Sequence, residues 1–267
     1  MSALVYPKFI GRLANNMFQI AACIGYAKKY GVKWGIKKGY VEQGFQANQV
    51  DRFMPDLPYC GGSYRRYSEH QRGWDNEWFN YHEIPCFPEG VELVGFFQSE
   101  KYFENAKNEV RSAFEPYIKW RDDLSNYCAI HVRRGDYVQH ADSFPPVTVD
   151  YLNAAMFKML DKPIQGFVVC SDDIEWCKAN ISPSTFYDLK FMEGSDEWTD
   201  FCAMASCGHH IMSNSTFSWW SSWLGRNPQK TVISPSHKRG NWFGFSSGIA
   251  GDCVDLLPKE WEQIQFR

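Results

Sequence analysis

Apolar and polar positions alternate most regularly in the second half of the chain, from about residue 127 onward. Short apolar runs with the length of buried strands lie at 127–132, 166–171, 184–189, 209–213 and 231–235. Segments with apolar residues at helical spacing lie at 148–160, 173–180, 196–206 and 216–225. Thr148 or Asp150 is a suitable cap for the first of these helices. Strands that alternate with helices predict right-handed βαβ units, and hence a parallel sheet with helices on both faces.

The first half of the chain is less regular. Strands are predicted at 2–9, 32–36 and 91–97, and helices at 16–31 and 99–118. Gly31 comes just past the last turn of the first helix, where a left-handed glycine often ends a helix. Residues 55–90 carry proline, glycine and aromatic residues without any period, which predicts an ordered irregular region more than a linker.

Two α/β domains joined near 118–126 are therefore expected. The first covers residues 1–120, and the second, a Rossmann-like domain with a doubly wound parallel sheet, covers 121–267. Two such domains leave a cleft between them, and ligands usually bind in clefts between domains.

Composition narrows the class of protein. The net charge of -3 and the isoelectric point near 6.2 provide no general field that would attract nucleic acid. The nine cysteines contain no CxxC pair, and several lie inside apolar runs, where cysteine acts as a small core residue. The 17% share of aromatic residues fits an aromatic-rich core, or flat rings that contact the apolar faces of sugars.

The chain carries neither a secretory signal pattern at its start nor an apolar run long enough to span a membrane. A cytoplasmic location is the resulting expectation, and a peripheral membrane association is compatible with it. The alternative is a Golgi protein that has been separated from its anchor.

The stretch YCAIHVRRGDY places four polar side chains where the strand 127–132 ends. They are His131, Arg133, Arg134 and Asp136. Ligands of open parallel sheets bind outside the carboxyl ends of the strands, and a guanidinium group matches two phosphate oxygens at once. The alternative for a single arginine is an ion pair with Asp136 or a helix cap. The cluster as a whole favours a seat for a diphosphate.

A second anion site is predicted in SNSTFSWWSSWLG. Asn214, Ser215 and Thr216 stand directly before a helix, whose free N–H groups and dipole favour negative charge. An ordinary N-cap is the alternative, but three such residues in a row exceed what one cap needs. The tryptophans that follow are expected in the core.

Two further segments carry polar residues at strand ends. Asp172 and Asp173 follow the strand 166–171, where one can accept hydrogen bonds from a ribose or a base and the other can cap a helix. Their DD spacing is not DxD, and no further carboxylates accompany them, so no metal site is expected. In FIGRLANNMFQIAA, Gly11 allows a close turn and Asn15 or Asn16 can cap the helix that follows.

Taken together and in this order, GRLANNMFQIAA, HVRRGDY, SDDIEW and SNSTFSWWSSWLG resemble the bacterial-type α-1,2-fucosyltransferases. That family shows a GxLGNQMFQYA-like start, an HxRRGDY motif and an NSTFSWWGAWL-like segment. The matching residues are spread from 11 to 224, and the last two elements are specific as a pair. Ala14, Asn16 and Ser221 depart from the pattern, the first two in the half expected to face the acceptor.

The resemblance implies a two-domain, GT-B-like fold and an inverting, metal-independent glycosyltransferase. L-Fucose would pass from GDP-β-L-fucose to the 2-hydroxyl of a terminal galactose on an oligosaccharide or glycolipid. GDP-fucose is then the donor substrate, and no cofactor is expected. Two alternatives are another GDP-sugar, of rhamnose or mannose type, and a non-catalytic protein that binds nucleotide or glycan.

The resemblance also implies roles for single residues. Arg133 would contact the β-phosphate, with His131 near the guanosine and Asp172 at the guanine or ribose. Ser215 and Thr216 would hold phosphate oxygens. Further donor contacts are expected from Arg134 and Asn214, and acceptor-side contacts from Asn15 and Asn16.

The acceptor hydroxyl also needs a proton acceptor. Asp136 is the nearest carboxylate of the basic motif and is the candidate general base. Its alternative role is to orient Arg133 or Arg134. Glu100 and Asp142 are the other candidate bases.

Overall fold

The computed structural model describes residues 3–38, 49–69, 79–182, 186–249 and 251–267. The chain divides into two compact units: unit 1 comprises Met1–Tyr117 and Cys253–Pro258, and unit 2 comprises Ile118–Asp252 and Lys259–Arg267. The sequence placed the boundary between residues 120 and 121. The short segment near the C-terminus joins unit 1 through Asp255, which accepts a hydrogen bond from the Tyr81 N–H (3.0 Å) and pairs with Lys101 (2.5 Å). These contacts link residues that are far apart in sequence, so no local sequence pattern predicts them.

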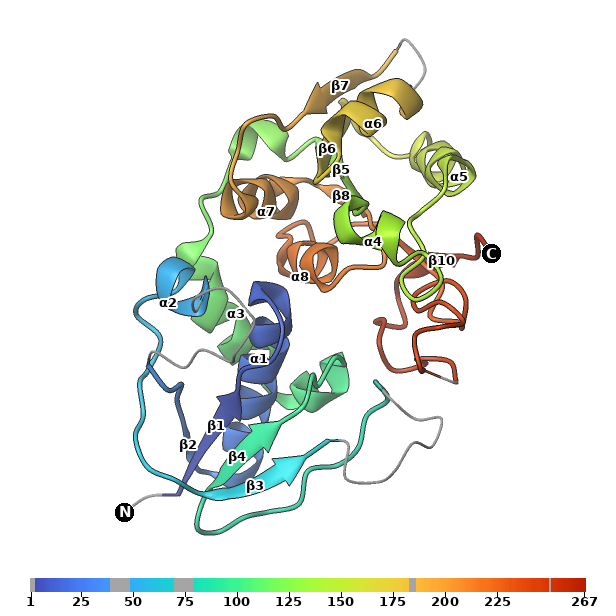
Figure 1. The fold of residues 1–267 in the computed structure, drawn as a ribbon. Helices are drawn as coiled ribbons and strands as arrows, with labels where there is room; N and C mark the ends of the chain where they lie inside the picture. Colours follow the sequence, from blue (N-terminus) through green and yellow to red (C-terminus); the bar gives the residue numbers. More distant parts are fainter. Residues whose placement is uncertain (1–2, 39–48, 70–78, 183–185, 250) are drawn as a thin grey trace. The chain divides into compact units, whose positions relative to one another are not determined.

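Unit 1 contains a four-stranded parallel sheet in the order β2-β1-β4-β3 (Figure 1). Its strands are β1 (Leu4–Lys8), β2 (Lys33–Trp34), β3 (Arg65–Ser68) and β4 (Val91–Val94). Its helices are α1 (Leu13–Tyr30), α2 (Gln49–Phe53) and α3 (Lys107–Phe114). Strand β3 lies in the region predicted to be irregular, because an edge strand that begins with two exposed arginines has no apolar alternation.

Helix α1 begins at Leu13, three residues before the predicted start at residue 16. Arg12 is its N-cap residue and no side chain caps it, so the prediction that Asn15 or Asn16 caps the helix is wrong. Both asparagines lie inside its first turns. Gly11 has φ +79°, as the predicted close turn requires. At the other end, Gly31 has φ +66° and its N–H bonds to the Ala27 carbonyl, which confirms the predicted glycine cap.

The long helix predicted at 99–118 is replaced by 3-10 turns and the shorter α3. The turns are Glu100–Tyr102, Glu104–Ala106 and Glu115–Tyr117. The first two pack closely on α1, since a Cβ at Gly25 would lie 2.1 Å from the Tyr102 carbonyl oxygen. Phe103 and Ala106 are fully buried in this packing. Tertiary contact with α1 therefore overrides the helical pattern at this position.

Unit 2 contains a six-stranded sheet in the order β10-β9-β8-β5-β6-β7, and every strand pair among the described residues is parallel. The strands are β5 (Tyr127–Val132), β6 (Gly166–Ser171), β7 (Asp188–Phe191), β8 (His209–Ile211), β9 (Val232–Pro235) and β10 (Glu262–Ile264). The chain runs outward from β5 through β6 and β7 in one direction, and from β8 through β9 in the other. The predicted doubly wound sheet is confirmed, with its topological switch point between β5 and β8.

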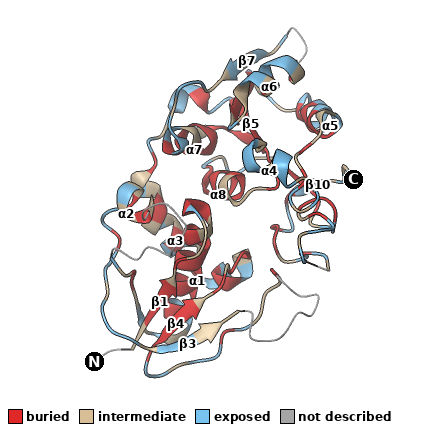
Figure 2. Ribbon diagram, viewed as in Figure 1, coloured by how far each residue is buried: buried red, intermediate tan, exposed pale blue. Residues whose placement is uncertain are grey.

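Helices cover both faces of this sheet. They are α4 (Gly135–Gln139), α5 (Val149–Met159), α6 (Ile174–Asn180), α7 (Glu197–Ser206) and α8 (Thr216–Leu224). The alternation along β5 assigns the faces, since Ile130 packs in one buried cluster with Leu152 of α5, and Ala129 in another with Met204 of α7. Figure 2 shows β5 and most of α8 coloured as buried. Thr148 caps α5, so of the two predicted caps the structure uses the first.

Differences from the predicted elements of unit 2 lie at the edges of the sheet and at the five-residue helix α4, which was not predicted. Strand β7 runs later than the predicted 184–189, of which 184 and 185 lie outside the described residues. Strand β10 was not predicted, because it has only three residues and the first two are polar and exposed. In the core, Trp219 and Trp220 are fully buried, as predicted.

All nine cysteines are free thiols, and most of them are buried. Burial raises the pKa of the Cys128 and Cys170 thiols well above the usual value. This confirms the prediction that cysteines in apolar runs act as core residues. Within the described ranges, no helix combines the length and apolar character that a membrane span needs.

Candidate donor-binding site

The predicted polar cluster of unit 2 lies at the switch point of its sheet. Strand β5 ends at Val132 and strand β8 at Ile211, and these strands are neighbours. The two strand ends are tied together by a hydrogen bond of 2.8 Å between His131 Nδ1 and Ser213 Oγ. The carboxyl ends of two adjacent strands thus bring the HVRRGDY and SNSTF segments into one place, as the sequence predicted from their positions.

His131 is buried, and it is neutral at physiological pH. Burial lowers the pKa of its imidazole to about 4, with Asp172 opposing this shift and Arg133 adding to it. Its ring also lies 5.6 Å from the Phe217 ring. A neutral, hydrogen-bonded imidazole in this position can orient neighbours or contact a ligand, but it is not a cationic general acid.

Arg133 is held between two carboxylates. Its Nη2 lies 2.5 Å from Asp136 Oδ1, and its Nη1 lies 2.6 Å from Asp172 Oδ2. The guanidinium carries five N–H donors, so three remain after these two bonds. The side chain is 22% exposed. Arg133 is therefore fixed in direction while it keeps donors that an incoming anion can use.

Arg134 is oriented toward α6. Its Nε bonds to Asp173 Oδ2 at 3.0 Å, and its guanidinium lies 4.1 Å from the centre of the Trp176 ring. Asp173 also caps α6 by accepting the Trp176 N–H, so the predicted helix cap is confirmed. Arg134 lies in the predicted cluster, but its guanidinium binds to Asp173 and Trp176 at helix α6.

Asp172 links both arginines. While its Oδ2 binds the Arg133 guanidinium, its Oδ1 accepts the Arg134 backbone N–H at 2.8 Å. Gly135 lies close beside it, and a Cβ at that position would lie 2.6 Å from Asp172 Oδ2, so a larger residue would displace this carboxylate. Both oxygens of this carboxylate are thus engaged in orienting the basic loop that follows β5.

The residues before α8 form the second half of the cluster. Ser215 caps the helix by accepting the Phe217 N–H, and Thr216 is its first residue. Asn214 is buried and donates through Nδ2 to the carbonyls of Pro145 (3.0 Å) and Trp242 (2.9 Å).

Asn214 also connects this segment to α4, because its carbonyl accepts the Tyr137 hydroxyl at 3.1 Å. Its Oδ1 is a buried acceptor without a hydrogen-bond partner in the described chain. The predicted donor-side residues, His131, Arg133, Arg134, Asp172 and Asn214 to Thr216, therefore share one edge of unit 2.

Asn15 and Asn16 lie in unit 1, at the carboxyl edge of its sheet. Asn15 Oδ1 accepts a hydrogen bond of 2.9 Å from Gln98 Nε2, which comes from the segment after β4. Asn16 is buried, and its Nδ2 bonds to the Ile10 carbonyl and to Gln19 Oε1, both at 3.2 Å. Asn15 thus lies at the rim of this edge, whereas Asn16 holds the turn beneath it.

Glu69 and Gln98 are polar residues of this edge that the sequence did not indicate. Glu69 Oε2 accepts the N–H groups of Phe96 (2.7 Å) and Phe97 (2.9 Å). Phe97 has φ +51°, a conformation that a bulky residue rarely adopts, and burial raises the pKa of the Glu69 carboxyl. The only local signal was a glutamine at the end of the apolar run VELVGFFQ.

The candidate bases differ in their partners. Asp136 has its side chain 49% exposed and is paired with Arg133, which is the orienting role that was its alternative. Glu100 pairs with Lys107, and Asp142 is an exposed residue of unit 2. Within the described parts of the chain, no three His, Cys, Asp or Glu side chains gather as a metal site would require.

Comparison with known proteins adds independent findings. The sequence model of glycosyl transferase family 11 matches residues 65–242. An alpha-1,2-colitosyltransferase of Escherichia coli is 27% identical and covers 98% of this chain and 99% of its own length. The galactoside alpha-(1,2)-fucosyltransferase 1 of Homo sapiens is 26% identical over 82% of this chain, which spans only 64% of that protein.

Among solved structures, POFUT1 in complex with GDP superimposes with a TM-score of 0.50 at 13% identity, over 87% of this chain and 98% of that one. At this identity the likeness concerns the fold alone. Together with the parallel sheets of the two units, it confirms the predicted α/β, GT-B-like fold class.

Proposed function

The chain belongs to glycosyl transferase family 11, and we propose that it transfers L-fucose from GDP-β-L-fucose to the 2-hydroxyl of a terminal galactose, with inversion and without a metal ion. The observation that carries this proposal is Arg133, held between Asp136 and Asp172 where β5 ends. The start of α8 lies at the end of the neighbouring strand, so one edge of unit 2 offers both a fixed cation and the positive end of a helix dipole.

A nucleoside diphosphate suits this edge. The remaining donors of Arg133 can bind the β-phosphate, and the hydroxyls of Ser215 and Thr216 at the start of α8 can bind other phosphate oxygens. His131 and Asn214 would lie on the nucleoside side, where the free Oδ1 of Asn214 can accept an N–H. Most of these groups are positioned by internal hydrogen bonds before any ligand arrives, which lowers the cost of ordering them.

The chemistry follows from where charge develops. When the acceptor hydroxyl attacks the anomeric carbon, the bond to GDP breaks and negative charge grows on the β-phosphate. Arg133 stabilises that charge more strongly in the transition state than in the bound donor, and this difference lowers the barrier. A guanidinium cannot lose its proton at working pH, so it supplies the charge that a divalent ion supplies in other transferases.

The acceptor proton requires a second group. Asp136 is the proposed base on the strength of its place in the motif, and its ion pair with Arg133 supports a shared orienting role. On the acceptor side we place Asn15 and Asn16, and Gln98 belongs with them because it bonds to Asn15. The acceptor is proposed to be an oligosaccharide or glycolipid that ends in galactose.

Transfer of colitose is a second candidate. The E. coli colitosyltransferase matches nearly the full length of both chains, whereas the human fucosyltransferase is matched over part of its length. Colitose differs from fucose by the absence of the 3-hydroxyl. A site that hydrogen-bonds this hydroxyl would reject the deoxy sugar by about 10⁴-fold or more, while a site that does not would accept both sugars.

A donor competition separates these candidates. The enzyme is incubated with lactose and equal concentrations of GDP-fucose and GDP-colitose, and the products are separated and analysed for linkage. Fucose at the 2-position of galactose, with an inverted anomeric centre, is the expected product. Exclusive use of GDP-colitose would assign the second candidate, and use of GDP-mannose or GDP-rhamnose alone would overturn both.

A further inference from the structure

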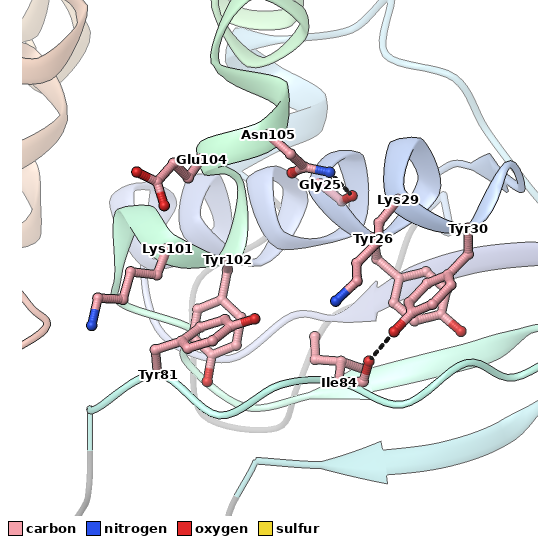
Figure 3. Close-up of a pocket in the computed structure, with 10 residues that line it drawn as sticks. All are labelled: Gly25, Tyr26, Lys29, Tyr30, Tyr81, Ile84, Lys101, Tyr102, Glu104 and Asn105. Carbon is pink, nitrogen blue, oxygen red and sulfur yellow. Dashed lines mark hydrogen bonds between the residues drawn. The ribbon is translucent and has the colours of Figure 1, made fainter.

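A cavity of about 410 Å³ opens in unit 1 against the second half of α1. Figure 3 shows two pairs of tyrosine rings at its opposite ends, Tyr26 with Tyr30 and Tyr81 with Tyr102, and Ile84 between them. The ring centroids within the pairs are 4.6 Å and 5.0 Å apart. The cavity is thus lined by aromatic rings that come from α1, from the segment near residue 81 and from the 3-10 turn before α3.

Three of the four rings are held in place through their hydroxyl groups. Tyr30 donates to the Ile84 carbonyl at 2.8 Å, and Tyr26 accepts the Phe87 N–H at 2.7 Å. The Tyr102 hydroxyl is bonded in the same way to groups outside the cavity. Since these three hydroxyls are already bonded, their rings present ordered apolar surfaces to the cavity, and Tyr81 packs edge-on against one of them.

Polar groups surround the rings. Lys29, Lys101, Glu104 and Asn105 line the same cavity (Figure 3). The Asn105 amide donates through Nδ2 to the Gly25 carbonyl at 3.1 Å, which leaves its Oδ1 as an acceptor on an exposed residue. Amine, carboxylate and amide groups therefore lie beside the apolar rings.

The charges of this cavity do not favour an anion. Lys29 pairs with Glu83 and Lys101 with Asp255, both at 2.5 Å. Glu104 adds a carboxylate to the lining. Each lysine is thus balanced by an acid, and the local charge is negative by one. A phosphate or sulfate group would meet no uncompensated cation here, in contrast to the edge that carries Arg133.

We propose that this cavity binds a neutral saccharide. The C–H faces of a pyranose ring are apolar and flat enough to pack on the tyrosine rings, while its hydroxyls can bond to the lysine, carboxylate and amide groups beside them. The volume lies in the range of small-molecule pockets. The cavity differs from the proposed acceptor edge of unit 1, because Gly25, the α1 lining residue nearest to Asn16, lies about 13 Å from it along the helix axis. Tyr102 connects the two through its hydrogen bond to Glu69.

The binding experiment uses the full-length protein with GDP at saturation, so that the donor site is occupied. Lactose, the neutral tetrasaccharide lacto-N-neotetraose and the acidic trisaccharide 3′-sialyllactose are titrated by calorimetry and by saturation-transfer NMR. We expect saturable binding of the neutral sugars, with the tetrasaccharide strongest and 3′-sialyllactose weaker than lactose. Selective saturation of the aromatic protons of the protein should reduce the signals of the bound sugar.

Four variants test the assignment to this cavity. Tyr81→Ala and the exposed Glu104→Ala should each weaken binding of the tetrasaccharide at least tenfold. Tyr81→Phe, which keeps the ring, should bind within twofold of the wild type. Tyr59→Ala removes a 41% exposed tyrosine of the same unit outside the cavity and serves as the matched control. Thermal unfolding of each variant checks that unit 1 is folded.

The inference is overturned if no neutral saccharide binds saturably, if the acidic sugar binds more tightly, or if Tyr81→Ala and Glu104→Ala bind like the control. Kinetics then identify the source of the saccharide. A higher KM for the tetrasaccharide, with the KM for lactose unchanged, assigns the site to the acceptor glycan. If the variants lose saccharide binding while the KM values for lactose and for the tetrasaccharide stay unchanged, the cavity binds a glycan that is not the acceptor. Because binding is measured without transfer, a failure of the proposed transferase activity is seen separately.

Discussion

Arg133 and Asp172 form the central ion pair of the donor-side edge, with Nη1 2.6 Å from Oδ2. The carboxylate follows β6 and the guanidinium follows β5, so the pair joins the ends of two adjacent strands. Asp136 holds the other side of the same guanidinium. The planar group is therefore fixed in direction by two acids, which is the preorganisation that stabilisation of a developing charge requires.

Arg133→Ala should lower kcat for fucosyl transfer by on the order of a hundredfold, since an interaction worth ~3 kcal/mol in the transition state would be lost. Arg133→Lys should fall between the wild type and the alanine variant, because an ammonium supplies charge without the planar fork. Steady-state kinetics with GDP-fucose and lactose measure both. Arg226→Ala removes an exposed arginine of the same unit, which stacks on Trp120, and should retain wild-type turnover. Near-wild-type kcat in Arg133→Ala would refute the mechanism.

Gly135→Ala should weaken GDP binding at least tenfold with little loss of stability. The added Cβ would lie 2.6 Å from Asp172 Oδ2 and must displace the carboxylate that orients Arg133. Gly135 begins α4 without a left-handed backbone, so alanine itself is tolerated by the chain. Calorimetric titration with GDP measures the effect. Gly61→Ala, where a Cβ meets nothing within 4 Å, is the control, and equal affinity in both variants would show that Asp172 does not orient the site.

Fucosyl transfer should continue at an unchanged rate in the presence of a chelator. The fixed charge of Arg133 takes the place of a divalent ion in the proposed mechanism. The rate is measured in 5–10 mM EDTA, about the usual excess over trace metals, and again after adding back Mg²⁺ or Mn²⁺. Activity that is abolished by the chelator and restored by either ion would require a metal site that the proposal does not contain.

Stability should fall as the pH drops from 6.5 toward 4, and His131 should contribute to that fall. Burial lowers the pKa of its imidazole from 6.5 to about 4, so between these values the unfolded state holds more protons than the folded state. The free energy of unfolding therefore decreases with decreasing pH, by up to about 3 kcal/mol from this residue alone.

Urea unfolding of the wild type and of His131→Asn across this pH range measures the contribution. The variant should lose less stability on acidification than the wild type does. His140→Asn changes an exposed histidine of the same unit and should follow the wild-type pH dependence. Identical pH dependence in all three proteins would mean that His131 is not buried as a neutral imidazole.

The sequence predicted most elements of unit 2, with α4 and β10 missed. Its strands are short apolar runs, and its helices carry periodic apolar residues behind capping side chains. These local patterns predict the structure well because the apolar face of each element is the face that the folded unit buries. Since the strands are parallel, their carboxyl ends meet at one edge. The position of Arg133, Asp172 and Ser215 at that edge followed from the order of the elements alone.

Unit 1 was predicted less well, for physical reasons that can be named. The segment after Ser99 folds into 3-10 turns because it packs against the backbone of α1 at Gly25, a contact that no local pattern shows. The expected caps at Asn15 and Asn16 failed because the helix starts at Leu13 and both amides bond elsewhere.

The sequence by itself determined the fold class, the doubly wound sheet of unit 2 and the chemical types of the donor-side residues. Only the tertiary structure decided how these residues are paired: that Asp172 orients Arg133, that Arg134 is committed to α6, and that four tyrosines gather around one cavity. Helix capping and helical periodicity act between near neighbours in sequence, and so the sequence displays them. Ion pairs and cavities join residues from distant segments, whose distances are set only when the whole unit packs.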